Sequence, residues 1–256
     1  MELNRIHNIP CAEMFAQLPE PAAVIAADPP YNIDYESNWQ EKMTSRKNHK
    51  EAAPRHKIEF FSDSEIDTSW IKPAFDALKE GGAMYLFTRW DVLHHWHTAA
   101  LESGFKVPQC IVWNKDMMSM GDLSLYGSQT EFLLFCTKGK HELRWDKREG
   151  NIWRFARGQM MANDLPKGGG WRHPTQKPIN LFKKIITYSS DMNDLVIDPF
   201  TGSGAACIAA QRLHRRFVGC DISPEFAAKA QRWIESDRKT SAKNHTQTKP
   251  MIGIHA

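Results

Sequence analysis

The sequence predicts an α/β fold built around a largely parallel β-sheet. Short apolar runs alternate with longer amphipathic stretches, as strands and helices do in such folds. Two of the apolar runs also end in an aspartate that a proline- or glycine-rich turn follows. The 256 residues suffice for one large domain, and the hydrophobic fraction of 41% and charged fraction of 25% are ordinary for a globular protein.

The strands are predicted from the short apolar runs. The run Ala22–Ala27 is apolar throughout, which is typical of a strand buried on both faces. Leu3–His7 would add a seventh strand at the start of the chain. In chain order, the other strands are expected at Ala22–Ala27, Ala83–Phe87, Lys106–Trp113, Glu131–Cys136, Asp194–Ile197 and Arg216–Cys220.

The helices are predicted from the amphipathic stretches between these runs. One of them is rich in alanine and directly follows a glycine-rich turn. We expect helices at Ser64–Leu78, Trp90–Ser103, Pro178–Ser189, Gly204–Leu213 and Pro224–Glu235.

Cysteine usage and hydropathy exclude several classes of protein. The five cysteines are scattered and odd in number, with no close metal-ligand spacing, so neither a disulfide framework nor a metal site is expected. No apolar run approaches the ~18 residues of a membrane helix, and the start lacks a signal-peptide pattern. We therefore expect a cytoplasmic protein that does not associate with membranes.

The first candidate site is the tetrad Asp28-Pro29-Pro30-Tyr31, which follows the strand Ala22–Ala27. In open α/β sheets, ligands bind at the carboxyl ends of strands. Asp28 and a backbone carbonyl near Pro29 could accept both hydrogens of an aromatic amino group, and Tyr31 offers a flat face for stacking on a base. The alternative is a plain turn, because aspartate and proline are common turn residues.

The second candidate site is the segment Asp198-Pro-Phe-Thr-Gly-Ser-Gly204. It follows a predicted strand and precedes an alanine-rich helix, so its glycines and the helix N-terminus could approach a ligand closely. The next predicted strand ends at Asp221, 23 residues after Asp198, about the spacing at which an acid meets a ribose in nucleotide-binding units. A purely structural turn is the alternative. The turn lacks Gly-x-Gly-x-x-Gly, which argues against NAD.

Together these motifs resemble the DNA amino-methyltransferases, whose catalytic tetrad is Asp/Asn/Ser-Pro-Pro-Tyr/Phe/Trp. The catalytic motif precedes the cofactor motif, and His173-Pro-Thr-Gln-Lys-Pro178 lies between them, as in the permuted beta subgroup. Gly81-Gly82 and Trp113-Asn114-Lys115 also resemble that subgroup. The resemblance implies a Rossmann-like, S-adenosylmethionine-dependent fold with a mostly parallel seven-stranded sheet and circularly permuted motifs.

The resemblance also implies residue roles. Asp28, Pro29, Pro30 and Tyr31 would engage a flipped base, and Asp221 would bind the ribose of S-adenosylmethionine. Lys177 could pair with the cofactor carboxylate, although an exposed lysine at a helix start is an equal alternative. The family's usual Gly-Asp after the first strand, whose acid lies near the adenine of the cofactor, is replaced by Pro10-Cys11. Recognition of the cofactor adenine would therefore come from Glu13 or backbone groups. The cofactor residues implied are Asp198, Pro199, Phe200, Thr201, Gly202, Ser203, Gly204, Asp221, Thr175 and Lys177.

Two basic stretches suggest contacts with double-stranded DNA. Lys42–Lys57 holds six Lys/Arg against one acid, and Lys138–Lys177 holds ten against four with tryptophans interleaved. Solvated loops are the alternative. We expect residues 1–236 to form the catalytic domain, with DNA-binding insertions at 36–60 and 140–172 and a fraying basic tail at 237–256. The candidate DNA contacts are Lys42, Arg46, Lys47, Lys50, Arg55, Arg144, Arg154, Arg157 and Arg172.

The predicted reaction is methylation of the N6 amino group of adenine in a flipped-out base of DNA, with no metal. Asp28 in the first motif position favours adenine, and an N4-cytosine enzyme is the nearest alternative. An RNA or protein amide methyltransferase fits the motif order less well. A catalytically silent DNA-binding protein is the third alternative, which the intact Asp28 and Tyr31 argue against. A homodimer is common among the proteins that the chain resembles.

Overall fold

The computed structural model describes residues 1–30, 66–116, 126–145, 147–156 and 176–247, of which 241–247 are described as backbone alone. The chain divides into two compact units, Pro30–Asp67 and the remainder, Met1–Pro29 with Thr68–Ala256. The β-sheet belongs to the second of these units, which also carries all three predicted acids at strand ends and the glycine-rich turn.

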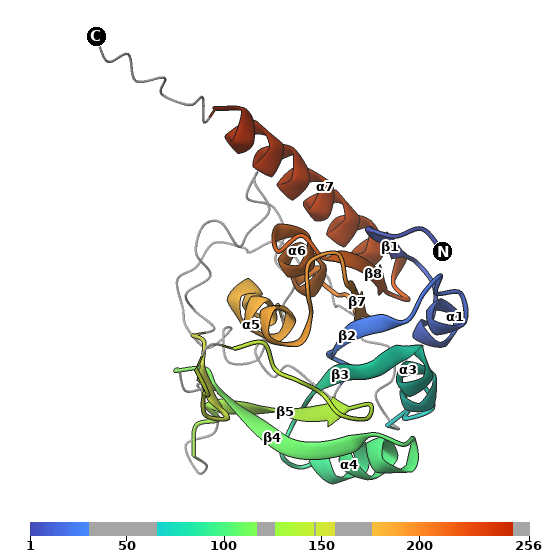
Figure 1. Cartoon of the computed structure of the whole chain (residues 1–256), viewed down its shortest axis with the longest axis vertical. Helices are drawn as coiled ribbons and strands as arrows, with labels where there is room; N and C mark the ends of the chain where they lie inside the picture. Colours follow the sequence, from blue (N-terminus) through green and yellow to red (C-terminus); the bar gives the residue numbers. More distant parts are fainter. Residues whose placement is uncertain (31–65, 117–125, 146, 157–175, 248–256) are drawn as a thin grey trace, which may run out of the picture. The chain divides into compact units, whose positions relative to one another are not determined.

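An eight-stranded sheet forms the centre of this unit, in the order β1-β8-β7-β2-β3-β5-β4-β6 (Figure 1). Strand β5 is antiparallel to both of its neighbours, and the other pairings are parallel. The prediction of a largely parallel sheet is therefore confirmed. The strands are β1 (Arg5–His7), β2 (Ala22–Ala27), β3 (Leu78–Thr88), β4 (Lys106–Asn114), β5 (Thr130–Thr137), β6 (Ile152–Arg154), β7 (Leu195–Asp198) and β8 (Arg216–Cys220).

Segments from the two halves of the chain meet at the middle of the sheet. Val24 and Ile25 of β2 lie beside Val196 and Ile197 of β7. Every residue of β2 is buried, which accounts for its uninterrupted apolar run. This pairing brings the carboxyl ends of β2 and β7 together, and these are the ends that carry the two candidate motifs.

Helices cover both faces of the sheet (Figure 1). Helix α5 packs on β2, β3 and α6, and α6 packs on β7 and β8. On the other face α4 packs on β4 and β5, and α3 packs on β3 and on α1. The helices are α1 (Cys11–Ala16), α3 (Ile71–Ala77), α4 (Leu93–Glu102), α5 (Ile179–Ser189), α6 (Ala205–Arg212) and α7 (Pro224–Gln247).

The structure differs from the sequence-based expectations at several elements. The sheet has eight strands rather than seven, because the three-residue β6 pairs with β4 inside a basic stretch that lacks a strand pattern. Helix α1 was not predicted and is only six residues long. The backbone is extended at Leu78, so α3 ends at Ala77 and β3 begins at Leu78, before the start of the predicted strand Ala83–Phe87.

The end of the described chain also differs from the prediction. Helix α7 runs to Gln247, although its end was expected at Glu235 and the chain beyond Asp237 was expected to fray. Residues 236–247 contain neither glycine nor proline, so the local sequence does not break the helix within this segment. Among the described residues, no helix combines the length and apolarity that a membrane crossing requires.

Candidate active site

Asp28 lies one residue beyond the carboxyl end of β2, as predicted. Its side chain is 24% exposed, and Pro29 behind it is buried. The buried strand fixes where Asp28 leaves the sheet, and the two prolines that follow restrict the turn. Pro30 begins the other compact unit, and Tyr31 lies outside the described residues.

The second motif forms a tight turn between β7 and α6. Asp198 is the last residue of β7 and is buried, and its Oδ1 accepts a hydrogen bond from the backbone N–H of Phe200 at 3.3 Å. The Thr201 hydroxyl donates to the carbonyl of Asp198 at 3.2 Å. Gly202 and Gly204 have φ of 48° and 90°, a left-handed conformation that favours glycine. The predicted strand, turn and helix are thus confirmed.

Asp221 directly follows β8, the strand next to β7. Its Oδ2 accepts the backbone N–H of Gly202, and its Oδ1 accepts that of Ser223, both at 2.9 Å. Burial raises the pKa of Asp221, while these two hydrogen bonds lower it. The acid at the end of β8 is therefore oriented by the glycine turn at the end of β7.

The carboxylates of the two motifs influence one another electrostatically. The pKa of Asp198 is raised to about 8, chiefly by burial and further by the negative charges of Asp28 and Asp221. The backbone N–H of Phe200 and the ammonium of Lys177 oppose this shift. Asp28 and Asp198 are far apart in the sequence, but the pairing of β2 with β7 places both at the same edge of the sheet.

Lys177 lies within this acidic group and is not the exposed lysine of the alternative interpretation. Its side chain is 5% exposed, and its Nζ forms a hydrogen-bonded ion pair with Oδ2 of Asp28. Its Nζ also lies 3.7 Å from Oε2 of Glu131, the second residue of β5. Glu131 Oε1 in turn pairs with Nζ of Lys115 at 3.3 Å. Asp28, Lys177, Glu131 and Lys115 thus form a chain of alternating charges.

Two of these four residues were not proposed as site residues from the sequence. Glu131 starts an ordinary strand pattern, and Lys115 was noted only as the end of a family-like tripeptide. No local pattern marks either one, because their pairing depends on β4 and β5 lying side by side. Trp70 was also missed: its ring packs edge-on against that of Phe200, with centroids 5.0 Å apart.

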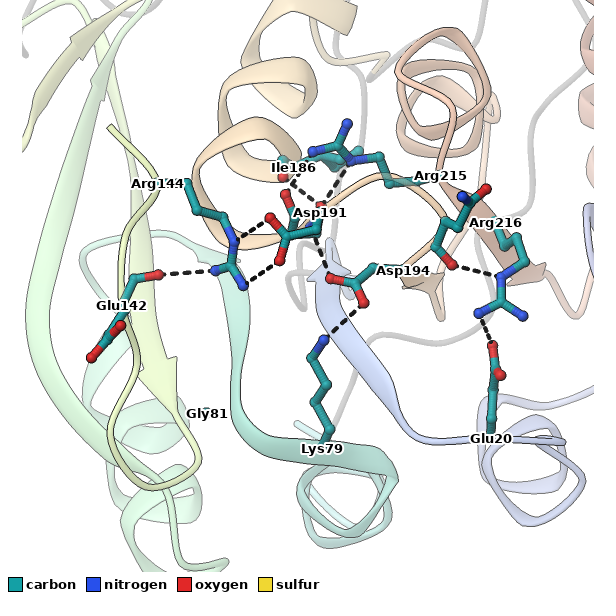
Figure 2. Close-up of polar contacts among 12 residues, drawn as sticks. Glu20, Lys79, Gly81, Glu142, Arg144, Ile186, Asp191, Asp194, Arg215 and Arg216 are labelled. Carbon is teal, nitrogen blue, oxygen red and sulfur yellow. Dashed lines mark hydrogen bonds and ion pairs between the residues drawn. The ribbon is translucent and has the colours of Figure 1, made fainter. Parts of the chain in front are cut away.

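The two described candidates for DNA contacts, Arg154 and Arg144, lie at different edges of the sheet. Arg154 is exposed and ends β6 beside Asn114, at the carboxyl end of β4 and thus at the edge of the sheet that carries Asp28. Arg144 lies near the amino end of β7, where its Nε and Nη2 contact both oxygens of Asp191 at 3.0 and 2.9 Å (Figure 2). That position argues against a DNA contact by Arg144.

Glu13 is an exposed residue of the first turn of α1. Within the described part of the chain, no group of histidine, cysteine and acidic side chains is arranged to hold a metal ion. The candidates that lie outside the described residues are Tyr31, Lys42, Arg46, Lys47, Lys50, Arg55, Arg157, Arg172 and Thr175.

The chain is similar to DNA methyltransferases in sequence. A family model described as "DNA methylase" matches residues 22–232. The type II methyltransferase M2.DpnII of Streptococcus pneumoniae is 28% identical in an alignment of 239 positions that covers 87% of this chain and 86% of the relative. The DNA adenine methyltransferase YhdJ of Escherichia coli K12 is 27% identical over 277 residues, covering 95% of this chain and 86% of YhdJ.

Solved structures share the fold. The M1.HpyAVI–SAM complex matches with a TM-score of 0.64 at 23% identity, over 90% of this chain and 98% of its own. The cytosine-N4-specific PvuII DNA methyltransferase matches with a TM-score of 0.67 at 16% identity. This match covers 93% of our chain and 89% of the PvuII chain. The fold is therefore the Rossmann-like fold of the methyltransferases. Because the family model spans most of the sequence and both motifs lie within it, the chain belongs to the DNA methylase family.

Proposed function

We propose that the protein transfers a methyl group from S-adenosylmethionine to the N6 amino group of an adenine flipped out of double-stranded DNA. The family supplies the reaction class. The observation that carries the proposal is the pairing of β2 with β7, which sets Asp28 and Asp198 at one edge of the sheet, close enough for their charges to interact. A base held at Asp28 and a methyl donor held at Asp198 would then be neighbours.

The charges at this edge suit S-adenosylmethionine, whose sulfonium and ammonium groups are cationic. Asp28, Asp198 and Asp221 carry up to three negative charges there, whereas Lys177 contributes one positive charge. Asp221, oriented by two backbone N–H groups, would accept the ribose hydroxyls. The turn from Pro199 to Gly204 precedes α6, whose N-terminus favours the cofactor carboxylate.

Asp28 would act on the target amino group. The lone pair of an aromatic amine is delocalised into the ring, so the nitrogen is a weak nucleophile. A carboxylate that accepts an N–H hydrogen bond favours the more tetrahedral nitrogen of the transition state. When bound, S-adenosylmethionine supplies an electrophilic methyl group: the new N–C bond forms as the S–C bond breaks. The nitrogen then loses one proton, which Asp28 can pass to water.

The DNA would be held by residues of the two basic stretches. A base inside the helical stack cannot align its nitrogen with a sulfonium methyl group, so the base must flip out at a cost of a few kcal/mol. Arg154 is the described residue that best supports this part of the proposal, because it is exposed at the same edge as Asp28. Lys42–Lys57 would add phosphate contacts.

The N4 amino group of cytosine is the second candidate target. The same acceptors serve either base, and the chain shares its fold with a cytosine-N4-specific enzyme. An adenine target is favoured by Asp28 at the first motif position and by the similarity to the adenine methyltransferase YhdJ.

Tritiated methyl transfer distinguishes these candidates. The protein would be incubated with labelled S-adenosylmethionine and DNAs of diverse sequence, and the DNA then digested to nucleosides and separated. We expect the label in N6-methyladenine. Label in N4-methylcytosine would favour the second candidate, and label in RNA or protein but in no DNA would reject both.

A further inference from the structure

The carboxylate of Asp28 already has a cationic partner within the protein. Lys177, the residue before the N-cap of α5, places its ammonium against Oδ2 of Asp28. The lysine is nearly inaccessible to solvent, whereas Asp28 keeps 24% of its side-chain surface exposed. The pair thus has a buried cationic end and a partly open carboxylate end.

The ammonium of Lys177 is held from more than one side. Oε2 of Glu131 lies 3.7 Å from Nζ, and the ring of Phe87 lies beneath it with 5.0 Å from Nζ to the centroid. Glu131 is itself balanced by Lys115, whose side chain is 10% exposed. A long lysine side chain normally has many rotamers, but these contacts leave Lys177 little freedom.

The contacts on the two sides of Lys177 differ. Among the described residues, Nζ of Lys177 contacts Oδ2 of Asp28 directly, whereas Glu131 on the other side is also paired with Lys115. The charge of Lys177 further acts on Asp198, the buried acid at the end of β7. Because the ammonium is fixed against one carboxylate oxygen of Asp28, it restricts the rotation of that carboxylate.

We propose that Lys177 is a positioning residue for the catalytic carboxylate: it orients Asp28 rather than binding the carboxylate of the cofactor. This inference rests on the proposed methyl transfer and deepens it. A carboxylate held in a fixed orientation accepts a hydrogen bond from the target amino group, whereas a rotated one accepts it poorly. Lys177 acts only through Asp28 and touches no reacting atom.

The test compares Lys177→Met, Lys177→Gln and Lys177→Arg in single-turnover methyl transfer at saturating DNA and cofactor. Methionine and glutamine remove the charge, and arginine keeps it. The matched control is Lys79→Met, because Lys79 pairs with Asp194 at 2.8 Å at the opposite edge of the sheet (Figure 2). Thermal unfolding identifies any variant that does not fold, and the glutamine variant, which keeps a hydrogen-bond donor, replaces methionine in that case.

We expect Lys177→Met and Lys177→Gln to lower the transfer rate about 100-fold at neutral pH. The dissociation constant of the cofactor should stay within about threefold, and Lys177→Arg and Lys79→Met should retain the rate of the unmutated chain. A cofactor affinity that falls more than about tenfold with an unchanged saturated rate would overturn the inference.

A second readout does not depend on activity. In protein with carbon-13 aspartate, the carboxyl signal of Asp28 (assigned with Asp28→Asn) should change its chemical shift in Lys177→Met and Lys177→Gln but not in Lys79→Met. An unchanged signal in both Lys177 variants would overturn the role of Lys177. Absence of methyl transfer by the unmutated protein would reject the proposed function instead, so the two failures are distinguishable.

Discussion

The backbone amide of Gly202 donates a hydrogen bond of 2.9 Å to Oδ2 of Asp221. This contact ties the turn after β7 to the acid after β8, and it requires the left-handed conformation of Gly202, whose φ is 48°. The cofactor pocket that we propose is therefore one hydrogen-bonded unit, not two adjacent loops.

Replacing Gly202 with valine should weaken cofactor binding. An L-residue with a side chain costs about 1–2 kcal/mol in the left-handed backbone conformation. The β-branched side chain of valine would also push the turn away from Asp221. We expect the affinity for S-adenosylmethionine to fall at least about tenfold, equivalent to about 1.4 kcal/mol, in titration calorimetry. Gly81→Val is the control, since Gly81 has φ of 75° at the opposite edge of the sheet. Equal affinity in both variants would contradict the pocket assignment.

Asp198 should make cofactor binding depend on pH. Its pKa is raised to about 8 by burial and by the charges of Asp28 and Asp221, so at pH 7 the neutral form prevails in the cofactor-free protein. A cationic ligand favours the ionised form, so binding should release a proton and tighten as the pH rises toward 8. Calorimetry in buffers of different ionisation enthalpy measures that proton. Asp198→Asn should abolish the proton release. Proton release that persists in this variant would show that Asp198 is not the group that loses the proton.

The same group should affect folding stability. The unfolded carboxyl has a pKa of 3.8, whereas the folded one is raised to about 8, so the folded state retains a proton that the unfolded state loses. The stabilising contribution is complete below pH 3.8 and is lost as the pH rises to about 8. The free energy of unfolding, measured by denaturant titration across this pH window, should decline less in Asp198→Asn than in the unmutated chain. Parallel plots of this free energy against pH would contradict the expectation.

Asp28→Ala should abolish methyl transfer and spare DNA binding. The carboxylate acts on the amino group in the transition state, so we expect a rate loss of at least about 100-fold. DNA affinity, measured by fluorescence anisotropy, should change by less than about threefold. Asp194→Ala, which removes the partner of Lys79, serves as the control for the loss of an acid from an ion pair. Turnover retained in Asp28→Ala would reject its role.

The two described arginines among the candidate DNA contacts should differ in their effect on DNA binding. Arg154→Ala removes an exposed charge beside the site and should reduce the slope of log affinity against log salt by about 0.9. Arg144→Ala should leave that slope unchanged, because its guanidinium is engaged with Asp191. It should lower the free energy of unfolding by at most about 1 kcal/mol, since the pair is partly exposed. A reduced slope for Arg144→Ala would place it at the interface after all.

The sequence alone determined the local features of this protein. The apolar run Ala22–Ala27 predicted its strand to the residue, and the aspartates at positions 28, 198 and 221 were assigned to strand ends where the structure has them. These features are local because burial on both faces demands continuous apolar residues and because a tight turn demands glycine with positive φ.

The tertiary structure alone decided which charges meet. Lys177 pairs with Asp28 across 149 positions, and Lys115 reaches Glu131 because β4 and β5 are neighbours. Arg144 belongs to a basic stretch in the sequence, yet the packing of the chain brings it to Asp191. A charge carries no local pattern that names its partner, since ion pairing depends on strand order and register, which form only when the whole sheet assembles.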